Sequence, residues 1–245
     1  MSVADRLLEL AHTDERAVVY TVVEGPGRGS KLLVLLDRDE VVGEGPPELV
    51  ALAPEIRRNH VFELGEAKIF AEVYGPPPRL VVVGAVDTAE ALCALARGIG
   101  WHTVCVDARA AFATPERIPS AGELVVAWPE DAFERMPLDR DTAVVTLAHD
   151  DRFDIPTLAA ALRSDCFYIG AIGSRRTQER RRERLLAEGL TEAELERIHG
   201  PAGLDIGAES PAETALAILA EALAVRVART GLPLRGTAQR IHVER

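Results

Sequence analysis

Short apolar runs alternate with amphipathic segments through the later two thirds of the chain. Apolar runs bounded by glycine or charged residues are typical of parallel strands that are buried on both faces, and the segments between them repeat their apolar residues at helical spacing. The predicted strands are 79–84, 102–106, 123–127, 142–148 and 167–171. Helices are predicted over 129–135, 155–163 and 211–229, and two more are predicted to begin at Asp87 and at Ser174. This alternation predicts an α/β fold with a Rossmann-like, doubly wound and mostly parallel sheet.

A different pattern precedes these elements. Residues 17–23, 31–36 and 68–74 are rich in β-branched residues and predict strands, and 46–58 predicts a helix. Three consecutive prolines follow at 76–78, and such a run is stiff and cannot join a central strand. We therefore expect a smaller N-terminal α/β domain over 1–75 and the Rossmann-like domain over 79–245. The stretch 231–245 is interpreted as a tail or a partner contact.

Capping patterns indicate where several helices begin. Asp87 with Glu90 and Ser210 with Glu213 have capping-box spacing, in which a side chain at each end satisfies a free backbone amide. Asp154 is expected to cap the helix over 155–163.

The helix predicted to begin at Ser174 carries two arginines in its first turn. Arg175 and Arg176 lie where the helix dipole is already positive, and a cation there costs about 0.3–1 kcal/mol. A phosphate beside the turn at Gly173 would neutralise this charge. It would be bound by the first backbone amides of the helix, by the hydroxyls of Ser174 and Thr177 and by the two guanidiniums. The alternative is that both arginines point into solvent or pair with distant carboxylates.

Further candidates follow predicted strands, where ligands of open α/β sheets bind. Gly84 ends the first strand of the Rossmann-like domain, and Asp107 follows the next, where it either meets a ribose hydroxyl or caps a turn. Val86 replaces the second glycine of the dinucleotide fingerprint, which disfavours the usual mode of dinucleotide binding. His149 and Asp150 either form a proton-transfer pair or shape a loop and cap the next helix.

A basic stretch and a glycine-rich loop complete the candidate regions. Most arginines of 179–184 are interpreted as a solvated face with i,i+4 pairs, and Arg180 alone lies one turn from the predicted anion site. The later loop over 200–210 contains Gly203, Asp205 and Gly207.

Composition and charge further restrict the classes of function that the sequence allows. The net charge of −11, from 28 basic and 39 acidic residues, argues against general nucleic-acid affinity. No apolar run reaches the roughly 18 residues of a membrane span, and 1–15 lacks the pattern of a signal peptide. The three cysteines are widely spaced in apolar surroundings. We therefore expect neither a disulfide framework nor a metal site, and a reducing, cytoplasmic location.

Several long motifs point to one family. They are EVYGPPPRLVVVGA (72–85), VDAR (106–109), FATPER (112–117), LAHDDRFD (147–154), YIGAIGSRRT (168–177), RIHGPAGLDIGAESPAE (197–213) and ILAEALAVR (218–226). Over 67–227 the chain resembles the XdhC/CoxI family, which are accessory proteins for the maturation of xanthine dehydrogenase and carbon monoxide dehydrogenase. It departs from the family pattern in GAVD (84–87) for GAGH and in having no cysteine before Cys93. We expect a short, divergent member.

The resemblance implies that the protein binds the molybdenum cofactor and assists its sulfuration and insertion into a molybdenum hydroxylase. Asp205 would then either hydrogen-bond the pterin ring or only stabilise its turn. The implied partners are the apoenzyme, with a cysteine desulfurase and a second copy of the chain as further candidates. This function requires binding and release rather than catalysis. The alternatives are an NAD(P)-dependent oxidoreductase with His149 as proton donor, and a nucleotide-binding regulatory module.

Overall fold

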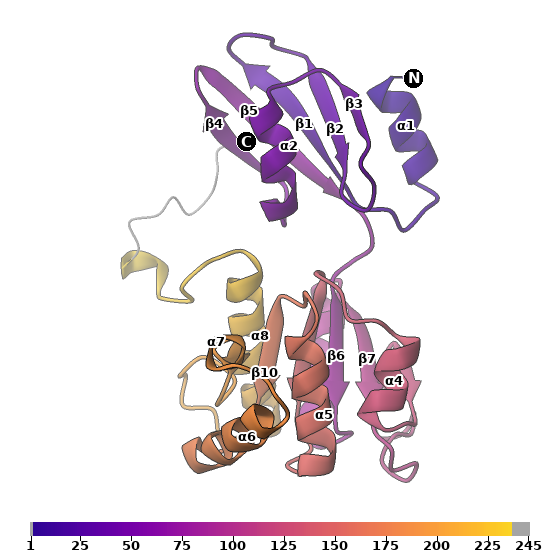
Figure 1. Cartoon of the computed structure of the whole chain (residues 1–245), viewed down its shortest axis with the longest axis vertical. Coiled ribbons are helices and arrows are strands. Elements are labelled where there is room, and N and C mark those ends of the chain that lie inside the picture. The colour runs from indigo at the N-terminus through magenta and orange to yellow at the C-terminus, as the bar shows by residue number, and fades with distance from the viewer. Residues whose placement is uncertain (1, 237–245) are drawn as a thin grey trace. The chain divides into compact units, whose positions relative to one another are not determined.

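The computed structural model describes residues 2–236. The chain divides into two compact units, one holding residues up to Pro76 together with the segment from Leu232, and the other holding Pro77–Gly231. The division falls within the proline run. Figure 1 shows the residues up to Pro76 in indigo to purple and Pro77–Gly231 in magenta to yellow. Within 2–236 no helix has the length and apolar character needed to cross a membrane.

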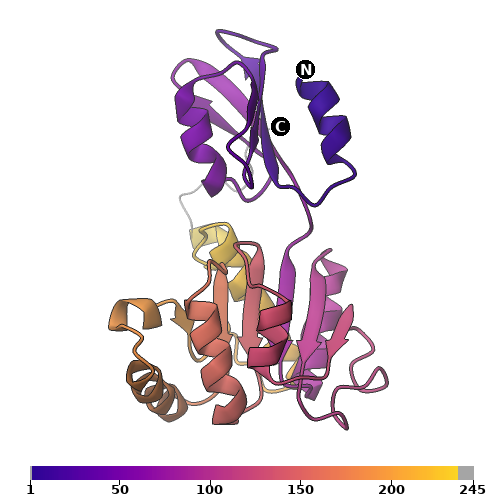
Figure 2. The ribbon, with the colours of Figure 1, turned by 45° about the vertical axis from the view of Figure 1, so that its right-hand side comes forward.

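The first unit is an antiparallel sheet in the order β3-β2-β1-β5-β4 with helices on both faces. Figure 2 shows α1 and α2 on opposite sides of this sheet. The strands are β1 (Ala17–Glu24), β2 (Lys31–Leu35), β3 (Val41–Gly43), β4 (His60–Leu64) and β5 (Ala67–Tyr74). The helices are α1 (Val3–Leu10) and α2 (Pro47–Leu52), which continues into the 3-10 turn η1 (Ala53–Glu55).

The central strand β1 is apolar along most of its length because both of its faces are covered. Val18 and Tyr20 pack with the residues under α2, whereas Ala17 and Val19 pack with those under α1. Successive side chains of a strand point to opposite faces, so both sets must be apolar. The three strands predicted in this unit are confirmed. The predicted helix over 46–58 is shorter, and β3 and β4 had not been predicted.

The second unit is a six-stranded sheet in the order β11-β10-β9-β6-β7-β8 in which all neighbours are parallel. Its strands are β6 (Arg79–Val83), β7 (His102–Val106), β8 (Glu123–Val125), β9 (Thr142–Thr146), β10 (Tyr168–Ala171) and β11 (Ile198–His199). This is the doubly wound Rossmann order, and the predicted fold class is confirmed. The sequence did not indicate β11, which is only two residues long.

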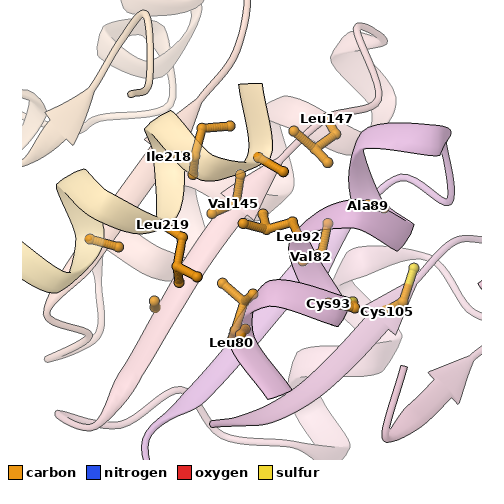
Figure 3. Packing of buried hydrophobic residues seen from close by; sticks show 14 of the residues in the cluster. Leu80, Val82, Ala89, Leu92, Cys93, Cys105, Val145, Leu147, Ile218 and Leu219 are labelled. Atoms are coloured by element: carbon orange, nitrogen blue, oxygen red, sulfur yellow. The ribbon is translucent and has the colours of Figure 1, made fainter. Parts of the chain in front are cut away.

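Helices cover both faces of this sheet. They are α3 (Asp87–Gly98), α4 (Pro129–Arg135), α5 (Asp151–Leu162), α6 (Arg175–Ala187), α7 (Glu192–Leu195) and α8 (Pro211–Arg226), with a 3-10 turn η2 at Leu234–Gly236 after the unit ends. Figure 3 shows one layer of the core, where Leu92 of α3 and Ile218 and Leu219 of α8 meet Leu80, Val82 and Val145 of the sheet. The residues of α4, α5 and α6 pack on the other face.

The start of two helices differs from the prediction. Asp87 is the first helical residue of α3 and Val86 is its cap, without a side-chain hydrogen bond. The Glu90 carboxylate instead accepts the Ser120 amide at 3.0 Å. Likewise α5 begins at Asp151 and is capped by Asp150, so Asp154 is not its cap. The capping box of Ser210 and Glu213 at the start of α8 is confirmed.

Parallel strands place the turns after β6 and β9 side by side at the middle of the sheet. The chain leaves β6 toward β7 and β8 and later returns to β9 on the other side of β6, which makes this the topological switch point. Gly84 has φ +106° there, and a Cβ on it would lie 2.9 Å from the backbone nitrogen of Ala148. The turn therefore requires glycine both for its conformation and for its close contact.

We predict that Gly84→Ala lowers the free energy of unfolding by more than Gly100→Ala. Gly100 also has a positive φ, +84°, but a Cβ there would meet nothing within 4 Å. The control therefore suffers only the conformational strain, about 1–3 kcal/mol, and the excess in Gly84→Ala measures the contact with Ala148. Urea unfolding of both variants tests this, and equal losses of stability would contradict it.

Candidate functional site

The carboxyl edge of the second sheet brings the predicted site residues into consecutive turns. Gly84 follows β6, Asp107 follows β7, and His149 and Asp150 follow β9. The segment 173–177 follows β10, and Gly203, Asp205 and Gly207 lie after β11. Because all six strands are parallel, these turns emerge at one edge of the sheet.

The turn between β10 and α6 has the glycine conformation and the serine cap that the sequence predicted. Gly173 has φ +124°, and a Cβ there would lie 3.1 Å from Thr177. The Ser174 hydroxyl caps α6 by accepting the Thr177 amide at 3.2 Å, and the two hydroxyl oxygens are 3.0 Å apart. Arg175 and Arg176 are exposed, and the first turn of α6 contains no acidic residue. Neither arginine forms an ion pair or side-chain hydrogen bond with any residue of 2–236. Their charge is not neutralised within the described chain.

A buried ion pair lies directly beneath this turn. Arg181 is 1% exposed and Asp154 is 0% exposed. The Nε and Nη2 atoms of Arg181 donate to Asp154 Oδ2 at 3.1 and 2.5 Å, and Asp154 Oδ1 accepts the hydroxyl of Thr146 on β9. The prediction that 179–184 forms a solvated face is therefore wrong for Arg181. Its position one turn before the buried Leu185 was the signal in the sequence, because residues four apart lie on one helix face.

The other arginines of α6 form exposed pairs. Arg180 and Arg184 both lie 3.1 Å from carboxylate oxygens of Asp151 on α5, and Arg182 lies 2.6 Å from Glu192. Arg180 therefore faces α5, and the predicted link between Arg180 and the anion site is not supported. The contacts of Arg180 and Arg184 join the acidic start of α5 to α6, and the contact of Arg182 joins α6 to α7.

Asp107 is fully engaged within the protein. Its Oδ1 accepts the backbone amide and Nε of Arg109, both at 2.9 Å, and its Oδ2 accepts the Ala85 amide at 2.8 Å and Nη2 of Arg109 at 2.6 Å. Burial alone would raise the pKa of Asp107, but these hydrogen bonds lower it below its usual value. A carboxylate offers about four acceptor positions, so none is left for a ribose hydroxyl. In this arrangement Asp107 anchors the turn after β6.

His149 and Asp150, for which a proton-transfer pair was one of two expected roles, do not hydrogen-bond each other in the described structure. Asp150 caps α5 by accepting the Arg152 amide at 3.0 Å, and its carboxylate also pairs with the Arg152 side chain at 2.7 Å. These hydrogen bonds lower the pKa of Asp150 to about 2. His149 is exposed, has φ +54°, and makes no side-chain hydrogen bond within residues 2–236. The loop-shaping and capping alternative therefore describes Asp150.

Another carboxylate, which is partly buried, organises the glycine-rich loop after β11. Glu221 of α8 accepts the Tyr168 hydroxyl at 2.6 Å and the Gly203 amide at 2.8 Å, and its other oxygen lies 3.1 Å from His199 Nδ1. Burial would raise the pKa of Glu221, but its three partners lower it. The pKa of Tyr168 is raised by burial and by Glu221. The sequence had placed these residues in motifs without assigning them contacts.

The rest of that loop is open. Asp205 is exposed and makes no side-chain hydrogen bond within 2–236, so no contact supports the turn-stabilising alternative. Gly207 has φ +70° with open space around its Cβ position. Gly203, by contrast, packs against α8, where a Cβ would lie 3.1 Å from Ala217. The loop is thus anchored at Gly203 and has the exposed carboxylate of Asp205 two residues later.

The three cysteines are buried and unpaired. Burial raises the pKa of Cys93 to about 12 and also raises the pKa values of Cys105 and Cys166. Only the thiolate is an effective nucleophile or metal ligand. Among the described residues there is also no group of His, Cys, Asp and Glu side chains that could hold a metal ion.

Comparison with known proteins relates the second unit to one family. Residues 80–222 match the model of the XdhC Rossmann domain. The chain is 30% identical over 158 residues to a protein of Bacillus subtilis named as a probable xanthine dehydrogenase subunit, covering 64% of this chain and 46% of that protein. It is also 30% identical over 154 residues to the molybdenum cofactor insertion chaperone PaoD of Escherichia coli, covering 63% and 42%. The match thus spans less than half the length of these curated relatives.

A solved structure extends the similarity to the fold of the whole chain. The crystal structure of a xanthine dehydrogenase from Bacillus halodurans superposes with a TM-score of 0.57 and 19% identity, covering 97% of this chain and 98% of that chain. At this identity the likeness concerns the fold alone.

We predict that the native protein resists thiol modification. A thiol reagent at neutral pH should label none of the three cysteines until a denaturant exposes them, because each thiol is buried and protonated. Mass spectrometry of the labelled protein before and after unfolding provides the measurement. Rapid labelling of the folded chain would show that a thiol is accessible.

We predict that Asp154→Ala destabilises the fold strongly. Removing one partner of a buried ion pair leaves an uncompensated charge, so the free energy of unfolding should fall by about 3–5 kcal/mol. Arg182→Ala on the same helix is the control, since its partners are exposed and the expected change is within about 0.5 kcal/mol. Urea denaturation measures both, and similar values for the two variants would refute the prediction.

Proposed function

The chain belongs to the XdhC family, and from this premise we propose that it binds the molybdenum cofactor and assists its sulfuration and insertion into a molybdenum hydroxylase. One relative is named for molybdenum cofactor insertion, and another is named as part of xanthine dehydrogenase. The observation that carries the proposal is the start of α6, where two arginines without protein partners in the described chain stand beside a capped helix terminus.

The residues at this terminus suit the phosphate of an anionic pterin. The first amides of a helix point outward and attract anions, and Arg175 and Arg176 add two charged donors to them. The hydroxyls of Ser174 and Thr177 lie in the same turn. Gly173 leaves the approach free of a side chain at this point. In the proposal these five residues hold the phosphate end of the cofactor.

The remaining candidates surround the same edge of the sheet. We propose that Asp205 and Gly207 contact the pterin, with Gly203 anchoring their loop. His149 and Asp150 border the switch point opposite Gly84, and Asp107 keeps the turn of Gly84 in place. The chain's own task is to bind, orient and shield the cofactor. Bond-making steps are not required of it.

The sulfur needed for sulfuration must then come from elsewhere. All three thiols are buried, so none is placed to carry sulfur to a bound cofactor. We therefore propose a cysteine desulfurase as the sulfur donor and the apoenzyme of a molybdenum hydroxylase as the recipient. A second copy of the chain is a further proposed partner that would shield the cofactor.

Several observations weigh against the oxidoreductase alternative. Asp107 has no acceptor free for a ribose, and Val86 occupies the position where a dinucleotide fingerprint has glycine. His149, the candidate proton donor, has no carboxylate partner within the described residues. These points also remove the specific support for a nucleotide-binding regulatory module.

We predict that Arg175→Ala combined with Arg176→Ala weakens cofactor binding by about tenfold or more, since charge-assisted hydrogen bonds contribute about 1.5–3 kcal/mol each. The measurement incubates the protein with molybdenum cofactor released from a molybdoenzyme, separates the complex by gel filtration, and quantifies the bound pterin by fluorescence after oxidation.

A matched control removes two positive charges from exposed sites in the first unit. Arg28→Ala with Arg58→Ala changes the net charge equally, and cofactor affinity should remain that of the unaltered protein. Equal affinity of both double variants would show that the start of α6 is not the site. Absence of bound pterin on the unaltered protein would contradict the proposed function itself.

A further inference from the structure

The turn that leads into α6 is held by polar side chains of the same helix. Nη1 of Arg181 donates to the carbonyl of Ile172 at 2.5 Å, and Nε2 of Gln178 donates to the carbonyls of Ala171 at 2.9 Å and Ile172 at 3.4 Å. Gln178 Oε1 in turn accepts Nη1 of Arg181 at 3.3 Å. These contacts fix the backbone immediately before Gly173.

The same guanidinium joins this turn to the neighbouring strand. Nε and Nη2 of Arg181 bind Asp154 on α5, and Asp154 accepts the hydroxyl of Thr146, the last residue of β9. Three residues after Thr146 the chain reaches His149, which precedes the cap of α5. One buried side chain therefore links the turns after β9 and β10.

Apolar packing contributes little to the position of α6. Its buried residues are Arg181 and Leu185, and the rest of the helix is polar or charged over most of its length. Its apolar contacts with the core come from Leu185 and the partly buried Leu186, both near the end of the helix, so its first turn needs another constraint. The planar guanidinium of Arg181 supplies this constraint, because its N–H donors point in fixed directions, toward Asp154 and toward the carbonyl of Ile172.

We propose that Arg181, together with Asp154, is a positioning residue for anion binding at the start of α6. The pair does not touch the ligand. It holds the backbone from Ile172 to Ser174 so that the first amides and hydroxyls of α6 converge on one anion, and it sets this turn relative to the His149 segment. The inference rests on the anion site of the proposed function and adds the residue that shapes it.

The test measures the affinity of the full chain for inorganic phosphate by isothermal titration calorimetry, alongside its thermal unfolding temperature. Arg181→Lys keeps the charge but cannot reach both partners in the same geometry, and we expect about tenfold weaker phosphate binding. Arg182→Ala on the same helix should bind phosphate as the unaltered protein does. Asp154→Asn keeps the side-chain volume and serves as a second variant should a change at Arg181 prevent folding.

Chemical rescue separates positioning from stability. Arg181→Ala leaves a cavity that free guanidinium can enter, so millimolar guanidinium should restore phosphate affinity in this variant and not in the Arg175→Ala, Arg176→Ala double variant. Phosphate affinity unchanged in Arg181→Lys and Asp154→Asn would overturn the proposal. So would guanidinium that raises the unfolding temperature of Arg181→Ala without restoring its phosphate affinity.

The outcomes also distinguish this inference from the proposed function. Phosphate binding that depends on Arg181, in a protein that does not bind the molybdenum cofactor, would refute the function and support the inference. Cofactor binding with phosphate affinity that is insensitive to Arg181 would refute the inference alone. If the unaltered protein binds no phosphate, the inference is refuted.

Discussion

Six parallel strands with apolar residues on both faces must be covered by helices on both sides, and every strand must leave the sheet at the same edge. Each turn at this edge exposes backbone amides and carbonyls that the sheet itself does not pair. The candidate site consists of these turns. Their geometry therefore depends on whatever satisfies the backbone between the end of a strand and the start of a helix.

Buried and partly buried carboxylates fulfil this task in three places. Asp107 accepts the amide of Ala85 beside Gly84, and Glu221 accepts the amide of Gly203. Asp154 acts through Arg181, which donates to the carbonyl before Gly173. In each case a glycine turn at the edge is fixed by a carboxylate from a different segment. Such an arrangement favours a rigid site, because a buried charge with all its partners satisfied is costly to disturb.

The distribution of positive charge gives this edge its chemical character. The chain is strongly acidic, and most arginines of α6 are paired with carboxylates of α5 or α7. Arg175 and Arg176 are the exceptions within that helix and lie where the dipole is also positive. These two arginines have no carboxylate partner among residues 2–236, although the chain as a whole is acidic. The anion site proposed above rests on this pair of charges.

The sequence by itself determined the periodic features and the family. Apolar runs identified most strands of the second unit, and the turn at Ser174 could be placed because capping and dipole effects act within a few residues. Motifs of ordered, well-spaced residues identified the family. Patterns of this kind involve residues that are close in the sequence, so they can be recognised without knowledge of the tertiary structure.

Only the tertiary structure decided which charged residues are buried. Arg181 belongs to a stretch of alternating charges that is typical of a solvated face, but the packing of α5 places Asp154 against it. A ribose hydroxyl was one of two expected partners of Asp107, although Arg109 and the turn after β6 occupy its oxygens. Tyr168, His199 and Glu221 meet only because β10, β11 and α8 are adjacent in space. The partner of a charge is set by long-range packing, whose free energy depends on residues far apart in the sequence.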